Sequence, residues 1–431
     1  MTAFYTDKYE FTMLAAALES GAAHKESVFE VFARRLPAGR QYGVVAGVNR
    51  VLDAIENFTF TEAQIEYLRI EGLGEEALSF LSNYRFKGDV IAFQDGELYF
   101  PYSPILTVKG TFAEAVILET VILSILNHDC AIAGAASRMS NAAQERPLIE
   151  MGSRRTHEES AVASALSAYI GGFTTTSNVA AGNRWGIPVA GTSAHAFILA
   201  HSDEVEAFQA QVNSLGVGTT LLVDTYDIRQ GIHNAVAVAG TELGAIRIDS
   251  GDLYDETVRA RALLDLMGAV NTKITVSSDI DEYAIDELLD RGAPIDSFGV
   301  GTRLVTGSGH PTASMVYKLV AIEDDSGRMN SVAKASSDKI SVGGQKESHR
   351  LVEGGQAVFD YIQSPDSSVP PNARPLAVRA IECGVRKVNP TPQESREHHQ
   401  KVLKELPRRA LSVSAGKSAI PNTLTEHIGG N

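Results

Sequence analysis

The sequence predicts an α/β protein built around an irregular parallel barrel of seven or eight strands. Between residue 146 and about residue 322, a short apolar run, a polar or glycine turn and a helical segment recur. Strands that alternate with helices in this way are expected to pair in parallel, with an active site at their carboxyl ends. An open, doubly wound sheet would produce a similar pattern. At 431 residues the chain is also long enough for two domains.

Composition narrows the class of protein and its partners. Hydrophobic residues make up 44% of the chain and charged residues 21%, which is typical of soluble globular proteins. The net charge of −15 argues against a nucleic-acid surface, which needs clustered Lys and Arg. Two cysteines predict no disulfide framework and fit a reducing cytoplasm. The apolar stretch Ala115–Leu126 contains Glu119 and is too short to span a bilayer, so we expect a buried helix and no membrane contact.

Residues 1–112 are expected to form the first part of a separate α/β domain. Thr6 and Asp7 are candidate caps for its first helix. Alternating and helical patterns define the elements that follow, and a turn is expected at Asp95 and Gly96. The expected elements are a helix over Tyr9–Glu19, a strand over Ser27–Ala33, a helix over Tyr42–Glu56 and two strands within Lys87–Leu106.

Residues 113–322 are expected to form the barrel domain. A long helix over Ala113–Gln144 leads into the repeating units. The expected strands are PLIEMG (147–152), GGFTTTS (171–177), IPVAGT (187–192), TTLLVDT (219–225), GAIRIDSG (244–251), KITVSSD (273–279), IDSFGVGT (295–302) and, as an eighth, MVYKLVAI (315–322).

Residues 323–431 break this pattern and are expected to rejoin the N-terminal domain. They begin with a hairpin that turns at Asp325–Gly327, and SVGGQK (341–346) is strand-like. The tail Glu394–Leu411 is a charged helix that contains His398 and His399. Adjacent histidines lack the spacing of metal ligands, so we expect both side chains at the surface.

The segment Ile187–His201, IPVAGTSAHAFILAH, is the first candidate for chemistry. Its apolar run ends at Gly191 and Thr192, and His195 follows where a helix is expected to begin. Glycine admits a ligand close to the backbone, and the hydroxyls of Thr192 and Ser193 can bind phosphate. In the structural alternative, Thr192 or Ser193 is an ordinary helix cap and His195 only fills the first turn. Taken alone, the segment favours this alternative.

Polar groups of other kinds follow the first two expected strands. Arg154 and Arg155 come directly after PLIEMG, and a guanidinium suits a carboxylate or phosphate, although a surface pair is an equal alternative. Ser177 lies in Thr174–Asn178, a run of hydroxyls and an amide without charge. Such a run suits hydrogen bonds to a small polar ligand, or plain helix capping.

Carboxylates follow the fourth and fifth expected strands. Asp224 and Asp227 lie in LLVDTYD, and Arg247 and Asp249 lie in IRIDSGDL. Asp252 brings a further carboxylate into the same turn as Asp249. Carboxylates placed in this way can hold ribose hydroxyls, or bind Mg²⁺ through its water ligands.

The sixth and seventh expected strands end in a carboxylate and a glycine loop. Asp279 and Glu282 have the spacing of a capping box, so a cap and a ligand contact are comparable alternatives for Asp279. Gly299, Gly301 and Thr302 follow the seventh strand. Barrels often bind phosphate with the loops after strands seven and eight, which favours a phosphate loop here.

Read in order, these strand ends closely resemble the nicotinate phosphoribosyltransferase family. The matching segments are TDKYEFTM (6–13), LPAGRQYGVVAG (36–47), MGSRRTHEESA (151–161), GFTTTSN (172–178), PVAGTSAHAF (188–197), LLVDTYD (221–227), IRIDSGDL (246–253), DSFGVGTRLVTG (296–307) and VYKLV (316–320). The resemblance implies transfer of phosphoribose from phosphoribosyl pyrophosphate to nicotinate in NAD salvage, with ATP as co-substrate and Mg²⁺ as cofactor. It also implies an open α/β sandwich domain beside the barrel and a homodimer with shared active sites.

The resemblance also assigns roles to single residues. Tyr9 matches a tyrosine that reaches across the dimer interface to stack on the pyridine ring, and Arg154 and Arg247 match arginines of the substrate site. His195 matches the histidine that ATP phosphorylates. The remaining matches are Asp249 near the base and ribose, Asp279 at the ribose hydroxyls, and Gly299, Gly301 and Thr302 at the 5′-phosphate.

Two positions bear on the choice of base. Met151 stands where many relatives carry Phe, so a pyridine stacked between two aromatic rings is in doubt, although a thioether can pack on a ring. Ser177 stands where a nicotinamide-specific relative would use an aspartate, which favours nicotinate. The alternatives are nicotinamide phosphoribosyltransferase, the shorter quinolinate enzyme, and a catalytically silent phosphosugar-binding protein that would be expected to lose His195 or Asp249.

Overall fold

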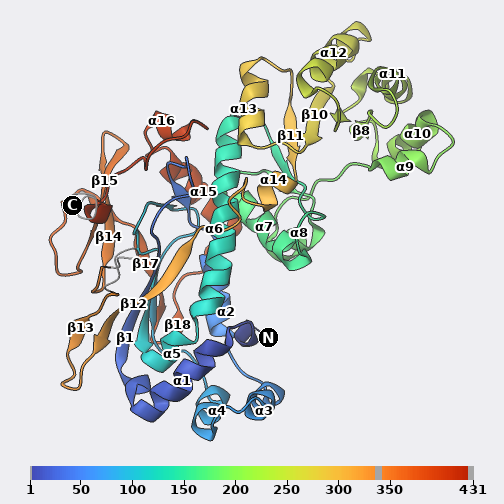
Figure 1. Ribbon diagram of the computed structural model, residues 1–431. Coiled ribbons are helices and arrows are strands. Elements are labelled where there is room, and N and C mark those ends of the chain that lie inside the picture. The colour runs from blue at the N-terminus through green and yellow to red at the C-terminus, as the bar shows by residue number, and fades with distance from the viewer. Residues whose placement is uncertain (1, 335–341, 426–431) are drawn as a thin grey trace. The chain divides into compact units, whose positions relative to one another are not determined.

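The computed structural model describes residues 2–334 and 342–425, and the chain divides into two compact units. Unit 1 combines residues 1–134 with residues 310–431, and unit 2 comprises residues 135–309. The first boundary falls inside helix α6 (Glu119–Ala142), which therefore contributes to both units. Figure 1 shows the elements of each unit.

Unit 1 is organised around an antiparallel sheet of seven strands in the order β13–β12–β1–β5–β3–β17–β18. These strands are β1 (Glu26–Ala33), β3 (Asp89–Phe93), β5 (Leu106–Thr111), β12 (Met315–Glu323), β13 (Met329–Ser331), β17 (Ala377–Glu382) and β18 (Val385–Arg386). Two smaller sheets consist of β15 (Gln356–Gln363), β14 (Glu347–Glu353) and β16 (Ala373–Pro375), and of β2 (Gly43–Val44) and β4 (Leu98–Tyr99). Both chain ends therefore contribute strands to the same sheet.

Most helices of unit 1 bury apolar residues in one core, to which α15 and α16 do not contribute. Phe11 and Leu14 of α1, Val31 of β1, Phe93 of β3 and Ile122 of α6 belong to this core. Figure 1 shows α1, α3 and α4 gathered at one end of the unit. The helices are α1 (Lys8–Ser20), α2 (Val48–Glu56), α3 (Glu62–Ile70), α4 (Glu75–Ser82), α5 (Phe112–Val116), α15 (Pro392–Leu403) and α16 (Arg408–Leu411), with short 3₁₀ turns at Thr2–Phe4 and Ala22–His24.

The helical stretch Phe112–Ala142 has the length and apolar composition of a membrane span, alone among the helices of the described residues. Within its most apolar window, 61% is buried inside the protein, and the core helix of a soluble protein passes the same test. The expected buried helix over Ala115–Leu126 is thus confirmed as α5 and the start of α6, separated by a short break.

Unit 2 contains a parallel sheet of six strands in the order β7–β6–β11–β10–β9–β8. The strands are β6 (Leu148–Glu150), β7 (Thr175–Thr176), β8 (Thr220–Leu222), β9 (Ala245–Ile248), β10 (Lys273–Ser278) and β11 (Ser297–Val300). From β8 to β11 the spatial order follows the chain, and β11 then pairs with β6, the first strand of the unit. Such a return of the last strand to the first curls the sheet as in a barrel.

The curled sheet is open at one place, which we call the seam. The segment IPVAGT joins β7 only through a single parallel bridge between Val189 and Thr176. Between this segment and β8, no backbone pairing occurs in the part of the chain that the structure describes. The seam therefore lies between residues 187–192 and β8, and the ring of strands is incomplete there.

Helices alternate with these strands. They are α7 (Glu158–Ile170), α8 (Val179–Trp185), α9 (His195–Leu199), α10 (Glu204–Leu215), α11 (Ile228–Ala239), α12 (Leu253–Leu266), α13 (Glu282–Asp290) and α14 (Thr302–Val305), with a 3₁₀ turn at Gly240–Glu242. Aspartates cap four of them: the side chains of Asp203, Asp227, Asp252 and Asp281 each accept a backbone N–H of the first turn.

Several expectations about the fold need correction. MVYKLVAI is not an eighth barrel strand, because β12 pairs antiparallel with β1 in the sheet of unit 1. Consequently unit 2 ends at residue 309 rather than at 322, and it begins inside α6 rather than at 113. Tyr42–Glu56 begins with β2 and becomes helical only at Val48. The expected hairpin is present as β12 and β13, and the first residue of SVGGQK lies outside the described residues.

The expected surface position of the tail histidines is also wrong. His399 of α15 is buried, and its Nδ1 lies 2.9 Å from the carbonyl oxygen of Gly96. Burial lowers the pKa of His399 to about 4. His398 is partly buried, with its Nε2 3.1 Å from a carboxylate oxygen of Glu97. A charged helix thus packs one polar face on the turn before β4, because backbone and carboxylate acceptors there pair with both rings.

Candidate active site

Polar side chains meet at the carboxyl edge of the parallel sheet in unit 2. They follow or belong to β8, β9 and β10, and the residues before and at the start of α9 join them. Parallel strands end at one edge, so residues distant in the sequence come together here. We call this group the strand-end cluster; its members are Thr192, His195, Asp224, Thr225, Arg247, Asp249 and Ser277.

His195 has polar groups near both ring nitrogens. Its Nδ1 lies 3.1 Å from the hydroxyl oxygen of Thr225. Its Nε2 lies 3.9 Å from Oδ1 of Asp224 and 4.0 Å from Oδ2 of Asp249. The side chain is 42% exposed. The imidazole is therefore oriented by one hydrogen bond, open to solvent, and near two carboxylates that can stabilise positive charge on the ring.

Arg247 of β9 links β10 to the segment before α9. Its Nε donates to the hydroxyl of Ser277 (2.7 Å), and its Nη1 donates to the hydroxyl of Thr192 (2.9 Å). Ser277 in turn donates to Oδ1 of Asp249 (2.7 Å), which lies 3.6 Å from Nη2 of Arg247. These bonds hold a mostly buried guanidinium beside the imidazole. A guanidinium so fixed is suited to an anionic ligand.

Asp224 supplies an acceptor that the protein itself does not use fully. Its side chain is fully buried, and Oδ2 accepts the N–H of Asp249 (2.8 Å) and the hydroxyl of Ser250 (2.7 Å). Its Oδ1 accepts no hydrogen bond from the described residues and is the oxygen nearest His195. Because an unpartnered buried carboxylate oxygen is costly, this atom marks a position for a proton donor or a cation.

The loops after β6 and β11 are packed against each other. A Cβ placed on Gly299 would lie 2.6 Å from Sδ of Met151, and one on Gly301 would lie 3.1 Å from the carbonyl oxygen of Met151. The two glycines thus make room for Met151, whose N–H donates to the carbonyl of Val300 (2.8 Å). Thr302 begins α14, a helix of a single turn. The glycine pattern after the seventh expected strand therefore has a packing cause, and its phosphate role stays a prediction.

Arg154 and Ser177 lie on the two loops that follow β6 and β7. Arg154 is exposed, and its side chain makes no hydrogen bond or ion pair with the described residues. The N–H of Ser177 donates to the carbonyl of Glu150 (2.8 Å), which fixes the start of its loop. An exposed, unpaired guanidinium remains available to an anion.

For two segments, the alternative of a helix cap is wrong. Asp281, rather than Asp279, caps α13, and Asp279 instead lies 3.3 Å from Nε of Arg303 at the surface. The residue before α9 is Ala194, which has no side chain able to cap. Thr192 is therefore not a cap but the acceptor of Arg247 described above. The helix cap in the structural alternative for this segment is therefore wrong, whereas His195 does begin α9 as that alternative expected.

The carboxylates of the cluster fit Mg²⁺ only as part of its coordination shell. No group of three or more His, Cys, Asp or Glu side chains among the described residues is arranged to hold a metal ion. The expected metal contact of Asp252 competes with its role as the cap of α12, where it accepts the N–H of Asp255 (3.0 Å). Mg²⁺ usually keeps several waters and substrate phosphates as ligands, so the free oxygen of Asp224 fits such an ion.

Tyr9 belongs to α1 of unit 1 and is half-exposed. Burial and the nearby carboxyl of Glu119 raise the pKa of Tyr9 to about 12, so the phenol stays protonated at neutral pH. An exposed aromatic ring on a helix is a suitable stacking surface for a flat ligand.

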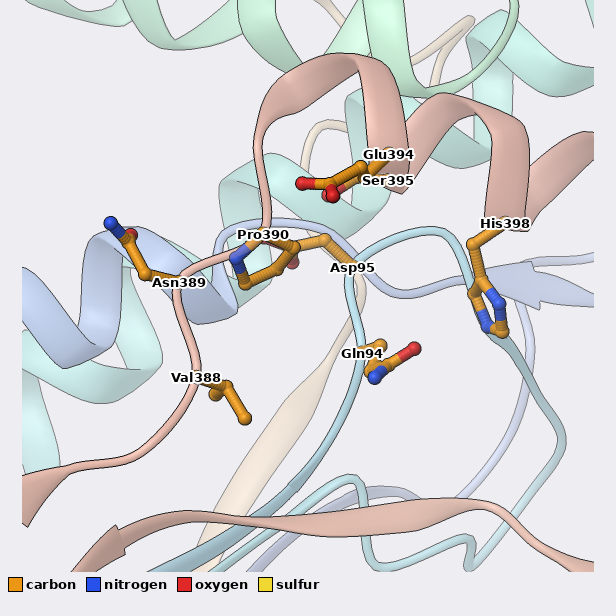
Figure 2. A pocket seen from close by; sticks show the side chains of 8 residues that line it. All are labelled: Gln94, Asp95, Val388, Asn389, Pro390, Glu394, Ser395 and His398. Carbon is orange, nitrogen blue, oxygen red and sulfur yellow. The ribbon is translucent and has the colours of Figure 1, made fainter.

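A separate pocket of about 400 Å³ lies in unit 1. Figure 2 shows Asp95 and Gln94 on one side and Glu394, Ser395 and His398 of α15 on the other. Burial raises the pKa of Asp95 to about 6, although three donors from the start of α2 oppose this shift. None of the sequence-predicted site residues lines this pocket.

Sequence reasoning missed two residues of the strand-end cluster and one buried carboxylate outside it. Thr225 follows Asp224 at the end of β8, and Ser277 lies in β10 where polar residues interrupt an apolar run. Glu150 ends β6 and is fully buried. A charged or hydroxyl residue at the carboxyl end of an expected parallel strand is the pattern that could have found them.

Comparison with known proteins is consistent across the chain. Residues 4–127 match the model of the nicotinate phosphoribosyltransferase N-terminal domain, and residues 147–362 match that of the nicotinate phosphoribosyltransferase family. Nicotinate phosphoribosyltransferase pncB1 of Mycobacterium tuberculosis is 50% identical over 427 residues, which cover 96% of this chain and 94% of that protein. Nicotinate phosphoribosyltransferase of Bacillus subtilis is 39% identical over 378 residues, covering 85% of this chain and 76% of that protein. Human nicotinic acid phosphoribosyltransferase has a similar fold, with a TM-score of 0.83 at 24% identity and coverage of 98% and 99%.

Proposed function

The chain belongs to the nicotinate phosphoribosyltransferase family, and from this premise we propose that it transfers phosphoribose to nicotinate and couples the transfer to ATP. The products are nicotinate mononucleotide and pyrophosphate, as part of NAD biosynthesis. The observation that carries the coupling is the position of His195, which is exposed, oriented by Thr225 and close to two carboxylates.

In the proposed coupling step, a ring nitrogen of His195 attacks the γ-phosphorus of ATP. The bond between the γ-phosphorus and its bridging oxygen breaks, ADP leaves, and later attack by water on the phosphohistidine releases phosphate. Asp224 and Asp249 stabilise positive charge on the imidazole from the Nε2 side. Arg247, held by Thr192 and Ser277, binds an anionic group of a substrate.

In the transfer step, the bond between the anomeric carbon of the ribose and pyrophosphate breaks as nicotinate attacks. Carboxylates near the developing oxocarbenium ion stabilise its charge, and Asp249 and Asp279 are proposed for this role and for the ribose hydroxyls. Gly299, Gly301 and Thr302 are proposed for the 5′-phosphate, and Arg154 for an anionic substrate group. Mg²⁺ neutralises the phosphates when bound, and the carboxylates of Asp224 and Asp249, with Asp252 through water, would contribute to holding it.

We further propose a cytoplasmic homodimer in which Tyr9 of one protomer stacks on the pyridine ring bound by its partner. The half-exposed phenol supports a stacking role for Tyr9. On the opposite face of the ring, Met151 replaces an aromatic residue and packs through its thioether.

The test is an assay of the purified protein with phosphoribosyl pyrophosphate, Mg²⁺ and each of nicotinate, nicotinamide and quinolinate, with and without ATP. We expect nicotinate to be the fastest substrate, and we expect ATP to increase the yield of mononucleotide. Faster turnover of nicotinamide would overturn the assignment of the base. Turnover that ATP does not change would overturn the coupling.

A further inference from the structure

We propose that Glu150 is a positioning residue that ties the loop after β6 to the loop after β7 and thereby sets the affinity for the pyridine base. The inference rests on the proposed function, because these loops carry Met151, Arg154 and Ser177. Glu150 itself does not contact the substrate in this account. It acts through the loops that do.

Glu150 is bonded to both loops at once. It is the last residue of β6 and is fully buried. Its Oε1 accepts the N–H of Gly152, and its Oε2 accepts the hydroxyl of Thr176 (2.5 Å). Its backbone carbonyl accepts the N–H of Ser177 (2.8 Å). A single buried carboxylate thus joins the loop after β6, at Gly152, to the end of β7, at Thr176.

Hydrogen bonds continue from Thr176 back to the first loop and close a ring. The hydroxyl oxygen of Thr176 accepts the N–H of Asn178 (2.9 Å). Nδ2 of Asn178 donates to the hydroxyl of Ser153 (3.1 Å), one residue after Gly152. Oδ1 of Asn178 also caps α8 by accepting the N–H of Ala181 (2.9 Å). The loops are therefore held to each other and to the next helix by one connected network.

The network requires a carboxylate with two acceptor oxygens. Both partners of the Glu150 side chain, Gly152 N–H and Thr176 O–H, are donors. The oxygen of Thr176 also accepts Asn178 N–H, so a hydroxyl that turned away from position 150 would need another acceptor for its proton. A Cβ at position 152 would lie 2.1 Å from Cγ1 of Val305 and 3.0 Å from Oε1 of Glu150, so the close approach needs glycine. Burial raises the pKa of Glu150, and the two donors oppose that shift.

Neither loop belongs to the strand-end cluster. His195 and its partners follow or belong to β8, β9 and β10, whereas the Glu150 network follows β6 and β7. A loosened network should therefore change the binding of the base without changing phosphorylation of His195. These two measurements separate positioning of the base loops from a general loss of structure.

The decisive variants are Glu150→Gln and Thr176→Val, with Thr176→Ser as the matched control. The amide of Glu150→Gln turns an N–H₂ toward one of the two donors, and Thr176→Val removes one donor. We expect the KM for nicotinate, and its Kd by calorimetric titration, to rise about 10-fold in either variant, as for one buried hydrogen bond lost. Thr176→Ser keeps the hydroxyl and should retain the wild-type KM.

Two further results support the proposal. The double variant Glu150→Gln/Thr176→Val should raise KM less than the product of the single effects, because valine removes the opposed donor. The rate of ATP-dependent phosphorylation should stay within about 2-fold of wild type in every variant. If Glu150→Gln does not fold, Thr176→Val and Thr176→Ser carry the same test.

Other outcomes overturn the proposed positioning role of Glu150. If Glu150→Gln and Thr176→Val lower only thermal stability and leave the KM and Kd for nicotinate within about 2-fold, Glu150 is structural and the proposal fails. Wild-type protein that binds nicotinate without transfer would refute the proposed function alone, and Kd would still decide the role of Glu150. Wild-type protein that does not bind nicotinate would overturn both.

Discussion

Two polar clusters, one in each unit, use the same residue types in opposite ways. In unit 1, Arg350 is fully buried between Asp360, which it binds through Nε and Nη2 (2.8 and 2.9 Å), and Glu97 (2.9 Å from Nη1). Arg374 binds the other oxygen of Glu97 (2.8 Å) and Glu405 (2.7 Å). Although burial opposes it, His398, Arg350 and Arg374 together hold the pKa of Glu97 below its ordinary value.

In the strand-end cluster of unit 2, by contrast, the hydrogen bonds and ion pairs are incomplete. Asp224 leaves one buried oxygen without a donor, and His195 stays 3.9 and 4.0 Å from its carboxylates. The difference teaches how to separate structure from function in charged clusters. A cluster whose every charge is paired contributes to folding, whereas one with an unpaired buried oxygen beside an exposed imidazole is prepared for a ligand.

The largest effect that this comparison predicts is that of His195→Ala. The variant should lose all phosphoprotein formation and ATP hydrolysis and keep only slow, ATP-independent transfer. Its free energy of unfolding should change by less than about 1 kcal/mol, since a part-exposed side chain with one hydrogen bond is removed. Radiolabelled phosphate incorporation measures the first effect, and His233→Ala, in α11 of the same unit, is the control. Retained phosphorylation would identify another acceptor.

The second prediction concerns the saturated cluster. Arg350→Met should lower the free energy of unfolding by about 3–5 kcal/mol, because Glu97 and Asp360 keep their buried charges without their partner. Turnover per folded molecule should be unchanged. Denaturant titration gives the stability, and Arg379→Met, which removes an exposed arginine from the same unit, should cost less than about 0.5 kcal/mol. Unchanged stability in Arg350→Met would contradict the structural role.

A third, smaller effect is the pH dependence of stability in unit 1. Burial holds the pKa of His399 at about 4, below its ordinary value of 6.5. The unfolded chain binds this proton between pH 6.5 and 4 while the folded chain does not, so the free energy of unfolding falls as the pH is lowered through this window. The loss should reach roughly 2–3 kcal/mol.

The control for this prediction is His399→Gln, whose amide can still donate to the carbonyl of Gly96. Asp95, whose pKa burial raises to about 6, gives the opposite slope, because its folded form takes up a proton first. The His399 contribution is therefore the difference between wild type and His399→Gln in urea titrations at pH 4.5, 5.5 and 6.5. Parallel curves for the two proteins would refute it.

The smallest effect should follow from Thr192→Val, which removes the acceptor of Arg247 Nη1. One hydrogen bond to a charged group is lost at a part-exposed position, so kcat/KM for nicotinate should fall roughly 5–10-fold. Thr192→Ser keeps the hydroxyl and should retain wild-type activity. Wild-type activity in Thr192→Val would contradict the role of the hydrogen bond, and a loss confined to Thr192→Ser would show that the methyl group matters instead.

The sequence predicted the parts of the site that depend on strand ends. Parallel strands place their carboxyl ends at one edge, so His195, Arg247 and Asp249 could be expected together, and the structure brings them together. Of the eight strands that this pattern predicted, six belong to the parallel sheet, one makes only an isolated bridge, and one pairs in the sheet of unit 1. Contacts that depend on the first residue of a helix were harder to predict from the sequence. For α13, a shift of two residues in the predicted start makes Asp281 the cap instead of Asp279.

Other features could not be read from local patterns. β12 has the apolar composition of a barrel strand, but its partner is β1, nearly three hundred residues earlier. His399 lies in a charged segment, and only the carbonyl of Gly96 explains how the ring is buried. Glu150 is charged within an apolar run, and its donors come from Gly152 and Thr176 on two loops. In each case the surroundings of the residue are set by partners outside its own local sequence pattern.

Side chains of the strand-end cluster also connect the two sides of the seam. Across it, strands exchange no backbone hydrogen bonds in the described part of the chain. The side-chain bonds from Arg247 to Thr192 and from His195 to Thr225 cross the seam, as do the longer ion pairs from His195 to Asp224 and Asp249. One of these bonds therefore involves the ring of His195, the residue that is proposed to receive a phosphoryl group. A phosphoryl group on Nδ1 of His195 would displace the hydroxyl of Thr225, so a reaction at that nitrogen would also break one of the bonds across the seam.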